Sequence, residues 1–217
     1  MKNYLEMTKA ERLAELEAVR RDYEEIKNGK RTLDMSRGKP NYQQLDLSMG
    51  MLSLDPAELV HAEDGTDCCN YGVMEGIPEC KKLMADVMGV TPDMVMVGGN
   101  SSLNMMFDTI ALFMNHPVTG GTPAWSLVPD RKFLCPVPGY DRHFTICESF
   151  GMEMITVDLH EDGPDMDKVE ELIKDETVKG MWCVPKYSNP VGVTYSDEII
   201  ERIAAMKPAA PDFLLMW

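Results

Sequence analysis

Short apolar runs alternate with amphipathic segments along most of the chain. Runs such as "KFLCPV" (132–137), "MEMITVDL" (152–159) and "DFLLMW" (212–217) have the length and composition of buried strands. Segments with apolar residues three or four positions apart lie between them, as expected of helices packed against a sheet. Strands that alternate with helices predict an α/β fold, with a mostly parallel sheet and helices on both of its faces.

Capping and terminating residues give these elements their expected bounds. Pro78 suits a first helical position, Asp165 and Ser196 suit helix caps, and Gly89 and Gly151 suit helix ends. The expected strands are residues 94–99, 132–137, 152–159, 179–185 and 212–217. The expected helices are residues 78–88, 101–115, 140–150, 166–174 and 196–206.

The amino-terminal part predicts a separate helix and arm. Thr8 and Glu11 form a capping-box signature, and Gly29 would close the helix that follows. Apolar residues follow at near-helical spacing in this segment: Leu13, Leu16, Tyr23 and Ile26. A stretch rich in Gly, Pro and Asn comes next. We therefore expect an amino-terminal helix and arm over residues 1–45 and a main α/β domain over 46–217.

Composition and charge argue against several classes of function. A net charge of -15 argues against a nucleic-acid or anionic-membrane surface, because either needs a basic face. No apolar run approaches the roughly 20 residues of a membrane span, and the first residues lack the apolar core of a signal peptide. The six cysteines show no metal-ligand spacing, so free thiols in a reducing cytoplasm are expected, with no metal site.

Three predicted strand ends carry residues that suit a ligand. In "VGGNSSLNMM", Gly99 lets the backbone approach closely, while Asn100 and Ser101 lie where a helix starts and an anion such as a phosphate is favoured. An ordinary serine-capped helix is the alternative. In "CPVPGYDRH", Tyr140 could stack on a flat ligand or be a core residue at a helix start. A lone histidine such as His143 is more often a surface residue than a catalyst.

The third strand end is "WCVPKYSNPVGVTY". Asn189 offers an amide donor, Pro190 could hold a strained or cis turn, and Gly192 frees the backbone. A plain loop is the alternative. Because ligands of parallel α/β sheets bind beyond the carboxyl ends of the strands, the three ends together predict one site for a phosphate, a flat ring and a polar ring substituent.

These residues resemble the fold-type I (class I/II) pyridoxal-phosphate-dependent aminotransferases. "SNPVG" is similar to the family's N-P-[TV]-G, and "PGY" to its ring-stacking P-x-[YW]. "NYGVMEGIPECKKLMADVMGV" is similar to its Y-x-x-x-x-G-x-x-x-L segment, and "VMVGGNSSLNMM" to its phosphate turn. "SRGKPN" resembles the glycine turn at the substrate carboxylate. The segments "MSRGKP" and "GGNSSLNMM" are similar to the corresponding segments of an aspartate aminotransferase-like branch of the family.

The resemblance implies a cofactor, pyridoxal 5'-phosphate, and a role for each matched residue. Residues 46–217 would be the first part of its binding domain. Gly99, Asn100 and Ser101 would bind the phosphate, Tyr140 would stack on the pyridine ring, and Asn189 would donate to the 3'-oxygen. Tyr71 would reach the phosphate of a neighbouring subunit, which implies a homodimer. Gly38 would lie near the α-carboxylate of an amino acid or 2-oxo acid substrate, and His143 aligns with an outer histidine of some members.

The chain also departs from the family pattern. Nothing corresponds to the Schiff-base lysine, because Lys186 and Lys207 lie at the wrong places, so no catalytic residue is assigned. The sequence stops at Trp217 inside an apolar run, and we expect a fragment that is inactive alone. Alternatives are a β-lyase or decarboxylase with the same cofactor, or a truncated, non-catalytic cofactor-binding or interaction protein.

Overall fold

The computed structural model describes residues 3–29, 38–118 and 120–217. The chain divides into two compact units. One comprises Met1–His61 with Asp67–Cys69, and the other comprises Ala62–Thr66 with Asn70–Trp217. The division expected from the sequence, an arm over residues 1–45 and a cofactor domain over 46–217, stays a prediction.

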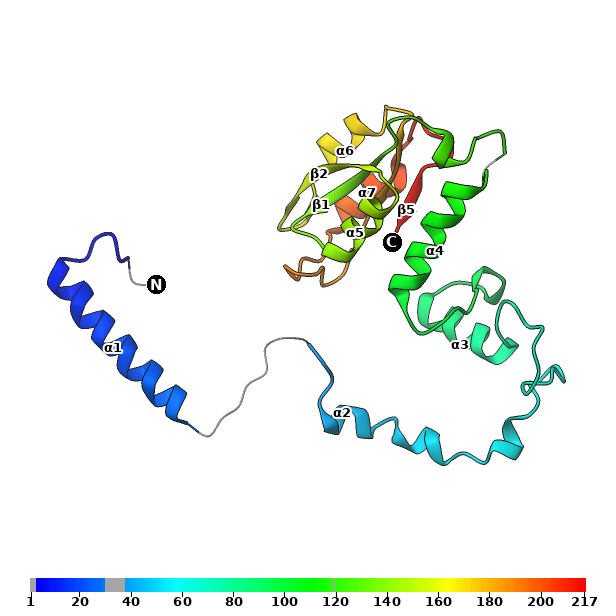
Figure 1. The fold of residues 1–217 in the computed structure, drawn as a ribbon, viewed down its shortest axis with the longest axis horizontal. Helices are drawn as coiled ribbons and strands as arrows, with labels where there is room; N and C mark the ends of the chain where they lie inside the picture. Colours follow the sequence, from blue (N-terminus) through cyan, green and yellow to red (C-terminus); the bar gives the residue numbers. More distant parts are fainter. Residues whose placement is uncertain (1–2, 30–37, 119) are drawn as a thin grey trace. The chain divides into compact units, whose positions relative to one another are not determined.

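The first unit contains the long helix α1, Lys9–Asn28, drawn in dark blue in Figure 1. Its capping box is formed: the Thr8 Oγ1 accepts from the Glu11 N–H at 3.3 Å, and the Glu11 carboxylate accepts from the Thr8 N–H at 2.7 Å. Gly29 is the residue at its end. The helix is as predicted, and its apolar residues at helical spacing, Leu13, Leu16, Tyr23 and Ile26, are all exposed.

Shorter helical turns follow in the same unit. Asn41 caps α2, Tyr42–Asp46, with its side-chain oxygen 2.9 Å from the Gln44 nitrogen. Two 3-10 turns come next, η1 (Met49–Ser53) and η2 (Pro56–Leu59). The connection that the Gly, Pro and Asn content predicts therefore holds local helical structure in the part that is described.

The second unit includes α3, Pro78–Met88, with proline at its first position. Gly89 ends this helix at φ 69°, a left-handed conformation that glycine adopts without strain. Ala85 is the buried residue of this helix, whereas Leu83 and Val87 are exposed.

The strand expected at residues 94–99 does not form. Pro92 starts a 3-10 turn, η3 (Pro92–Met94), and the residues after it belong to no strand. The backbone N–H of Val97 donates instead to the carbonyl of Glu75 at 2.9 Å. A loop contact therefore satisfies the backbone group that a sheet neighbour would have bonded.

The other four expected strands are present in one sheet with the order β3-β2-β1-β4-β5. Neighbours pair in parallel, except that the short β3 adds an antiparallel edge to β2. The strands are β1 (Lys132–Val137), β2 (Glu153–His160), β3 (Gly163–Pro164), β4 (Val178–Trp182) and β5 (Leu214–Met216). The predicted mostly parallel sheet is confirmed.

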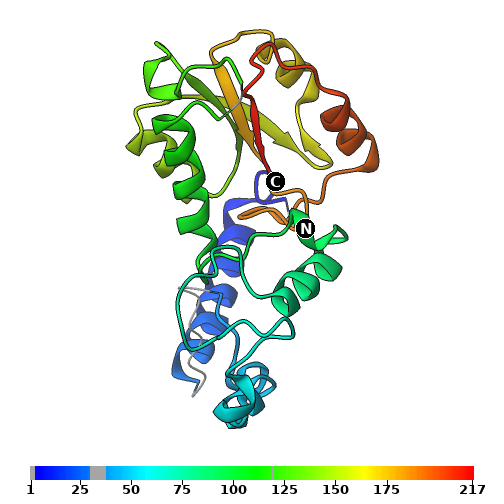
Figure 2. The ribbon, with the colours of Figure 1, turned by 90° about the vertical axis from the view of Figure 1, so that its right-hand side faces the viewer.

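Helices cover both faces of this sheet, as Figure 2 shows. The covering helices are α4 (Ser102–Asn115), α5 (Asp141–Ser149), α6 (Met166–Leu172) and α7 (Asp197–Ala205), and a 3-10 turn, η4 (Trp125–Leu127), follows α4. The capping predictions hold, since Asp165 accepts from the Lys168 N–H and Ser196 from the Ile199 N–H.

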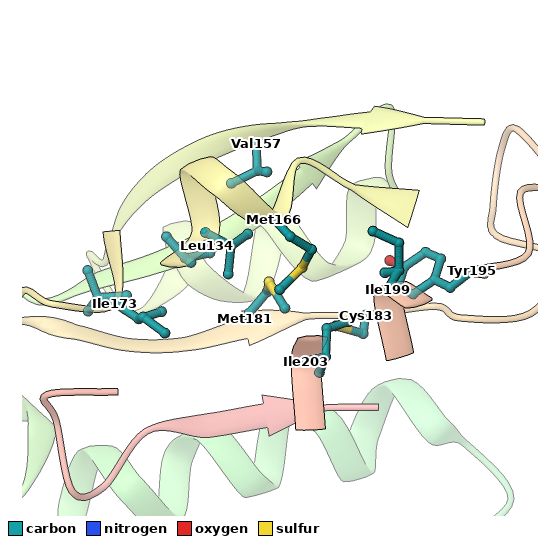
Figure 3. Close-up of a cluster of buried hydrophobic side chains, with 11 residues drawn as sticks. Leu134, Val157, Met166, Ile173, Met181, Cys183, Tyr195, Ile199 and Ile203 are labelled. Carbon is teal, nitrogen blue, oxygen red and sulfur yellow. The ribbon is translucent and has the colours of Figure 1, made fainter. Parts of the chain in front are cut away.

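Alternating side chains of the strands divide the core into two clusters. Leu134 and Met181 point to the α6 and α7 side, where they pack with Met166, Ile199 and Ile203 (Figure 3). The other face is richer in aromatic rings and packs against α4, α5 and η4; its buried members include Phe133, Cys135, Trp125, Ile146 and Trp182. Across the described residues, no helix combines the length and apolarity needed to cross a bilayer.

Candidate functional site

A hollow lies at the carboxyl ends of β1 and β4, where ligands of parallel sheets bind. The segments that follow these two strands supply most of its wall. The lining residues are Pro136, Pro138, Gly139, Tyr140, His143, Phe144, Leu159, Trp182, Cys183, Val184, Ser188, Asn189 and Tyr195. Two residues predicted from separate motifs, Tyr140 and Asn189, therefore line the same hollow.

The loop after β1 places Tyr140 at the start of α5, where it is half-buried. The close turn depends on Gly139. A Cβ at that position would overlap the Pro136 carbonyl oxygen and would lie 2.8 Å from Cζ of Phe144. The glycine therefore lets the chain turn sharply and bring the tyrosine ring to the hollow.

The turn after β4 presents Asn189. Ser188 and Val193 close it with two hydrogen bonds: the Ser188 N–H donates to the Val193 carbonyl, and the Val193 N–H donates to the Ser188 Oγ, both at 2.9 Å. Gly192 has φ 75°, and the Asn189–Pro190 peptide bond is cis. Asn189 is exposed, and its side-chain amide has no hydrogen-bond partner among the described residues. The turn thus holds the backbone and leaves the amide free for a ligand.

His143 is not the surface residue that its isolation in the sequence predicts. It is 6% exposed, because one turn into α5 its ring lies between Tyr140 and the end of β4. Its imidazole stacks on Trp182 with ring centroids 4.5 Å apart and planes 12° apart. Burial lowers the pKa of His143, since it disfavours the charged ring.

Sequence reasoning did not single out Trp182, Ser188 or Tyr195, although all three line the hollow and are buried. The alternation of side chains along a strand could have indicated the position of Trp182. Positions 180 and 182 face the same side of the sheet, and on that side Trp182 packs toward Phe133 and α5. Ser188 and Tyr195 lie outside regular elements, where no such periodicity exists.

The residues predicted to bind a phosphate lie elsewhere in this unit. Ser101 caps α4, and its Oγ accepts from the Asn104 N–H at 3.3 Å. Gly99 and Asn100, just before it, are exposed. None of the three is among the residues that line the hollow. Ser101 therefore has the capping role that was the alternative interpretation, and phosphate binding stays a prediction.

Two further predicted residues are also absent from the lining of the hollow. Tyr71 is 98% exposed. Gly38 is exposed and belongs to the first unit, and a Cβ there would meet nothing within 4 Å. Their predicted roles toward a neighbouring subunit and a substrate carboxylate are untested.

The model of one protein family, described as aspartate amino-transferase, matches residues 7–217 of the chain. The chain belongs to this family. The aspartate aminotransferase of Corynebacterium glutamicum is 46% identical to it over 201 residues, which are 93% of this chain and 46% of that protein. The chain spans about half the length of the curated relatives it matches.

Solved structures carry the family's fold. The crystal structure of an aspartate transaminase from C. glutamicum has a TM-score of 0.84 and 45% identity, covering 97% of this chain and 50% of that one. The structure of cystalysin from Treponema denticola, which contains a pyridoxal 5'-phosphate cofactor, has a TM-score of 0.57 at 19% identity and covers 86% of this chain and 43% of that one. The latter likeness concerns the fold alone.

Proposed function

We propose that the chain supplies part of the cofactor site of a pyridoxal-phosphate-dependent aminotransferase, which transfers an amino group between an amino acid and a 2-oxo acid. The observation that carries the proposal is the shared hollow of Tyr140 and Asn189. An aromatic ring and a free amide at the carboxyl ends of parallel strands fit a flat heterocycle with a hydroxyl substituent. Membership of the family supports the same cofactor.

Different residues of the chain would bind different parts of the cofactor. The Tyr140 ring would stack on its pyridine face, and the Asn189 amide would donate to its 3'-oxygen. Ser101, with Gly99 and Asn100, would hold the phosphate at the start of α4, where backbone N–H groups are free and the helix dipole favours an anion. When bound, the cofactor supplies an electron sink for chemistry at the amino acid Cα.

The chain alone would not turn over substrate. Within the part of the chain that the structure describes, no lysine lines the hollow. Lys186 follows β4 but is exposed, and Lys207 follows α7. Without an amine to bond the cofactor aldehyde and move a proton, the chain would bind the cofactor non-covalently. Transaminase turnover by the isolated 217 residues would contradict this.

Tyr71 would act in a homodimer. Its side chain is almost fully exposed, so it is accessible to the phosphate of a second copy. Sedimentation of the chain with and without pyridoxal phosphate, for wild type and Tyr71→Phe, tests this role. A chain that stays monomeric at every concentration would remove the inter-subunit contact from the proposal.

The cofactor assignment is tested by equilibrium dialysis of the chain against pyridoxal phosphate. Asn189→Asp keeps the side-chain shape but replaces the amide donor with a carboxylate, and Tyr140→Ala removes the ring. Loss of a hydrogen bond to a charged oxygen should raise the dissociation constant roughly tenfold. Tyr23→Ala, on the exposed surface of α1, is the matched control for a lost tyrosine. Equal retention by wild type and Asn189→Asp would overturn the assignment.

Aspartate is the first amino donor to test, because the C. glutamicum relatives at 45–46% identity are named aspartate aminotransferase or transaminase. The assay needs a protein of the relatives' full length, because this chain spans about half of it. Comparison of aspartate, alanine and 2-aminoadipate as donors with one 2-oxo acid acceptor would rank them. A rate with aspartate no higher than with the other two would remove it from the proposal.

A further inference from the structure

We propose that Trp182 is a positioning residue of this site, which fixes the Tyr140 ring through the His143 imidazole. The inference rests on the proposed function, because it concerns how the tyrosine that would stack on the cofactor is held. Trp182 itself would contact neither the phosphate nor the reacting atoms.

Three aromatic rings form a continuous stack from the core to the hollow. The Trp182 and His143 rings are nearly parallel, 12° apart, with 4.5 Å between centroids. The His143 ring then meets Tyr140 at 89° with 5.1 Å between centroids. Offset-parallel and edge-to-face arrangements are the two favourable geometries of aromatic pairs. All three residues line the hollow.

The inner end of the stack is immobilised. Trp182 is 2% exposed, and its indole N–H donates to Sγ of Cys147 at 3.2 Å. The ring of Phe133, which is fully buried, lies 5.1 Å away on a neighbouring strand. A hydrogen bond and tight packing therefore hold the indole in one orientation, which gives His143 a fixed surface to stack on.

The outer end has few other restraints. Tyr140 is only half-buried, and in the described part of the chain its hydroxyl has no hydrogen-bond partner. Its ring orientation consequently depends on the His143 contact. A ring ordered before the ligand arrives loses less conformational freedom on binding, so removal of the inner support should weaken the stacking interaction.

Trp182→Leu removes the support, and Trp125→Leu is the matched control. Both variants delete an indole from the same core cluster, but only Trp182 contacts His143. Pyridoxal phosphate is titrated into the 217-residue chain, with affinity from equilibrium dialysis and ring orientation from the circular dichroism induced in its visible band. Trp182→Leu should raise the dissociation constant roughly threefold or more and reduce the induced signal per bound molecule, as expected for a lost aromatic contact.

A ligand-free measurement tests the positioning separately. Fluorotyrosine is incorporated, and the Tyr140 fluorine resonance is assigned with Tyr140→Phe. The wild type and Trp125→Leu should give one sharp Tyr140 signal, and Trp182→Leu a shifted or divided one. His143→Leu should reproduce this change, and it decides the question if Trp182→Leu does not fold.

The outcomes distinguish the two proposals. An unchanged Tyr140 resonance in both Trp182→Leu and His143→Leu overturns the positioning role, whatever the cofactor does. If the variants change the Tyr140 resonance but the wild-type chain retains no pyridoxal phosphate, the positioning role is supported and the proposed function is refuted. If Trp182→Leu changes the Tyr140 resonance and weakens pyridoxal phosphate binding, and Trp125→Leu does neither, both the positioning role and the proposed function are supported.

Discussion

Lys179 and Asp212 form a buried ion pair, with 2.8 Å between Nζ and Oδ1 and side chains 6% and 2% exposed. The other carboxylate oxygen of Asp212 accepts from the Trp125 indole N–H at 2.9 Å. The Asp212 carboxylate, just before β5, thus connects Lys179 on β4 with Trp125 in η4. Neither Lys179 nor Asp212 lines the hollow, so the ion pair belongs to the core beneath the hollow.

Asp212→Ala should destabilise the chain by about 3–5 kcal/mol, because it leaves the Lys179 ammonium buried without a counter-charge. Urea titration followed by circular dichroism measures the change in unfolding free energy. Lys179→Met combined with Asp212→Asn should recover most of the loss, since the charge is gone and the amide oxygen still accepts from Trp125. Lys174→Ala, which removes an exposed pair with Glu171, should have a much smaller effect. Similar losses in all three variants would contradict the prediction.

Gly180→Ala tests the contact between β1 and β4. A Cβ at Gly180 would overlap the Phe133 ring and the Leu214 carbonyl oxygen, and both belong to the packed sheet. Phe133 is fully buried and cannot move aside, so we expect a loss of about 1–3 kcal/mol in unfolding free energy. Gly50→Ala is the control, because nothing lies within 4 Å of its added Cβ. Equal thermal unfolding midpoints for the two variants would show that the strands adjust freely.

The sequence was most informative where a single side chain decides a backbone conformation. Thr8, Asp165 and Ser196 were predicted as caps, and each accepts the expected backbone N–H. Tyr140 and Asn189 could be predicted to meet because they follow β1 and β4, and parallel neighbours end at the same edge of a sheet. Local chemistry and topology were sufficient for these features.

Features that depend on distant partners could not be predicted. Residues 94–99 have strand-like composition, but the Val97 N–H donates to the Glu75 carbonyl, and in the described part of the chain these residues pair with no strand. Gly99–Ser101, at the end of this segment and just after it, are not among the residues that line the hollow shared by Tyr140 and Asn189. The burial of His143 depends on Trp182, which is remote in sequence, so an isolated histidine carries no signal of its stack. The exposed faces of α1 and α3 show that amphipathic spacing indicates what a helix can bury, and does not identify its partner.

Ser101 variants separate the capping role from the phosphate role. Ser101→Ala should cost about 1 kcal/mol in unfolding free energy, because the Asn104 N–H loses its acceptor. Ser101→Asp keeps a good cap and should leave stability nearly unchanged, but its negative charge should repel a phosphate. If Ser101 binds the cofactor phosphate, Ser101→Asp weakens pyridoxal phosphate binding more than Ser101→Ala does. Equal binding by wild type and Ser101→Asp in dialysis would assign Ser101 to capping alone.

The buried His143 should make stability depend on pH. Its pKa in the folded chain lies below the ordinary value of 6.5, since burial disfavours the imidazolium. In the unfolded chain the ring takes up a proton as the pH falls through about 6.5, while the folded ring stays neutral. Its stability contribution is therefore complete above the unfolded pKa, and it declines as the pH falls from there toward the folded pKa.

The difference is measured as the unfolding free energy from urea titrations at about pH 7.5 and about pH 5.5. His143→Phe is the matched variant, because it keeps an aromatic ring on Trp182 but cannot titrate. Relative to His143→Phe, the wild type should lose stability over this interval, by no more than about 1.4 kcal/mol per pH unit. The other titratable groups are common to both chains, so the difference between them isolates His143. Parallel pH profiles for the two chains would mean that the imidazole accepts a proton without leaving its stack, and that the ring on Trp182 is solvated well enough to be charged.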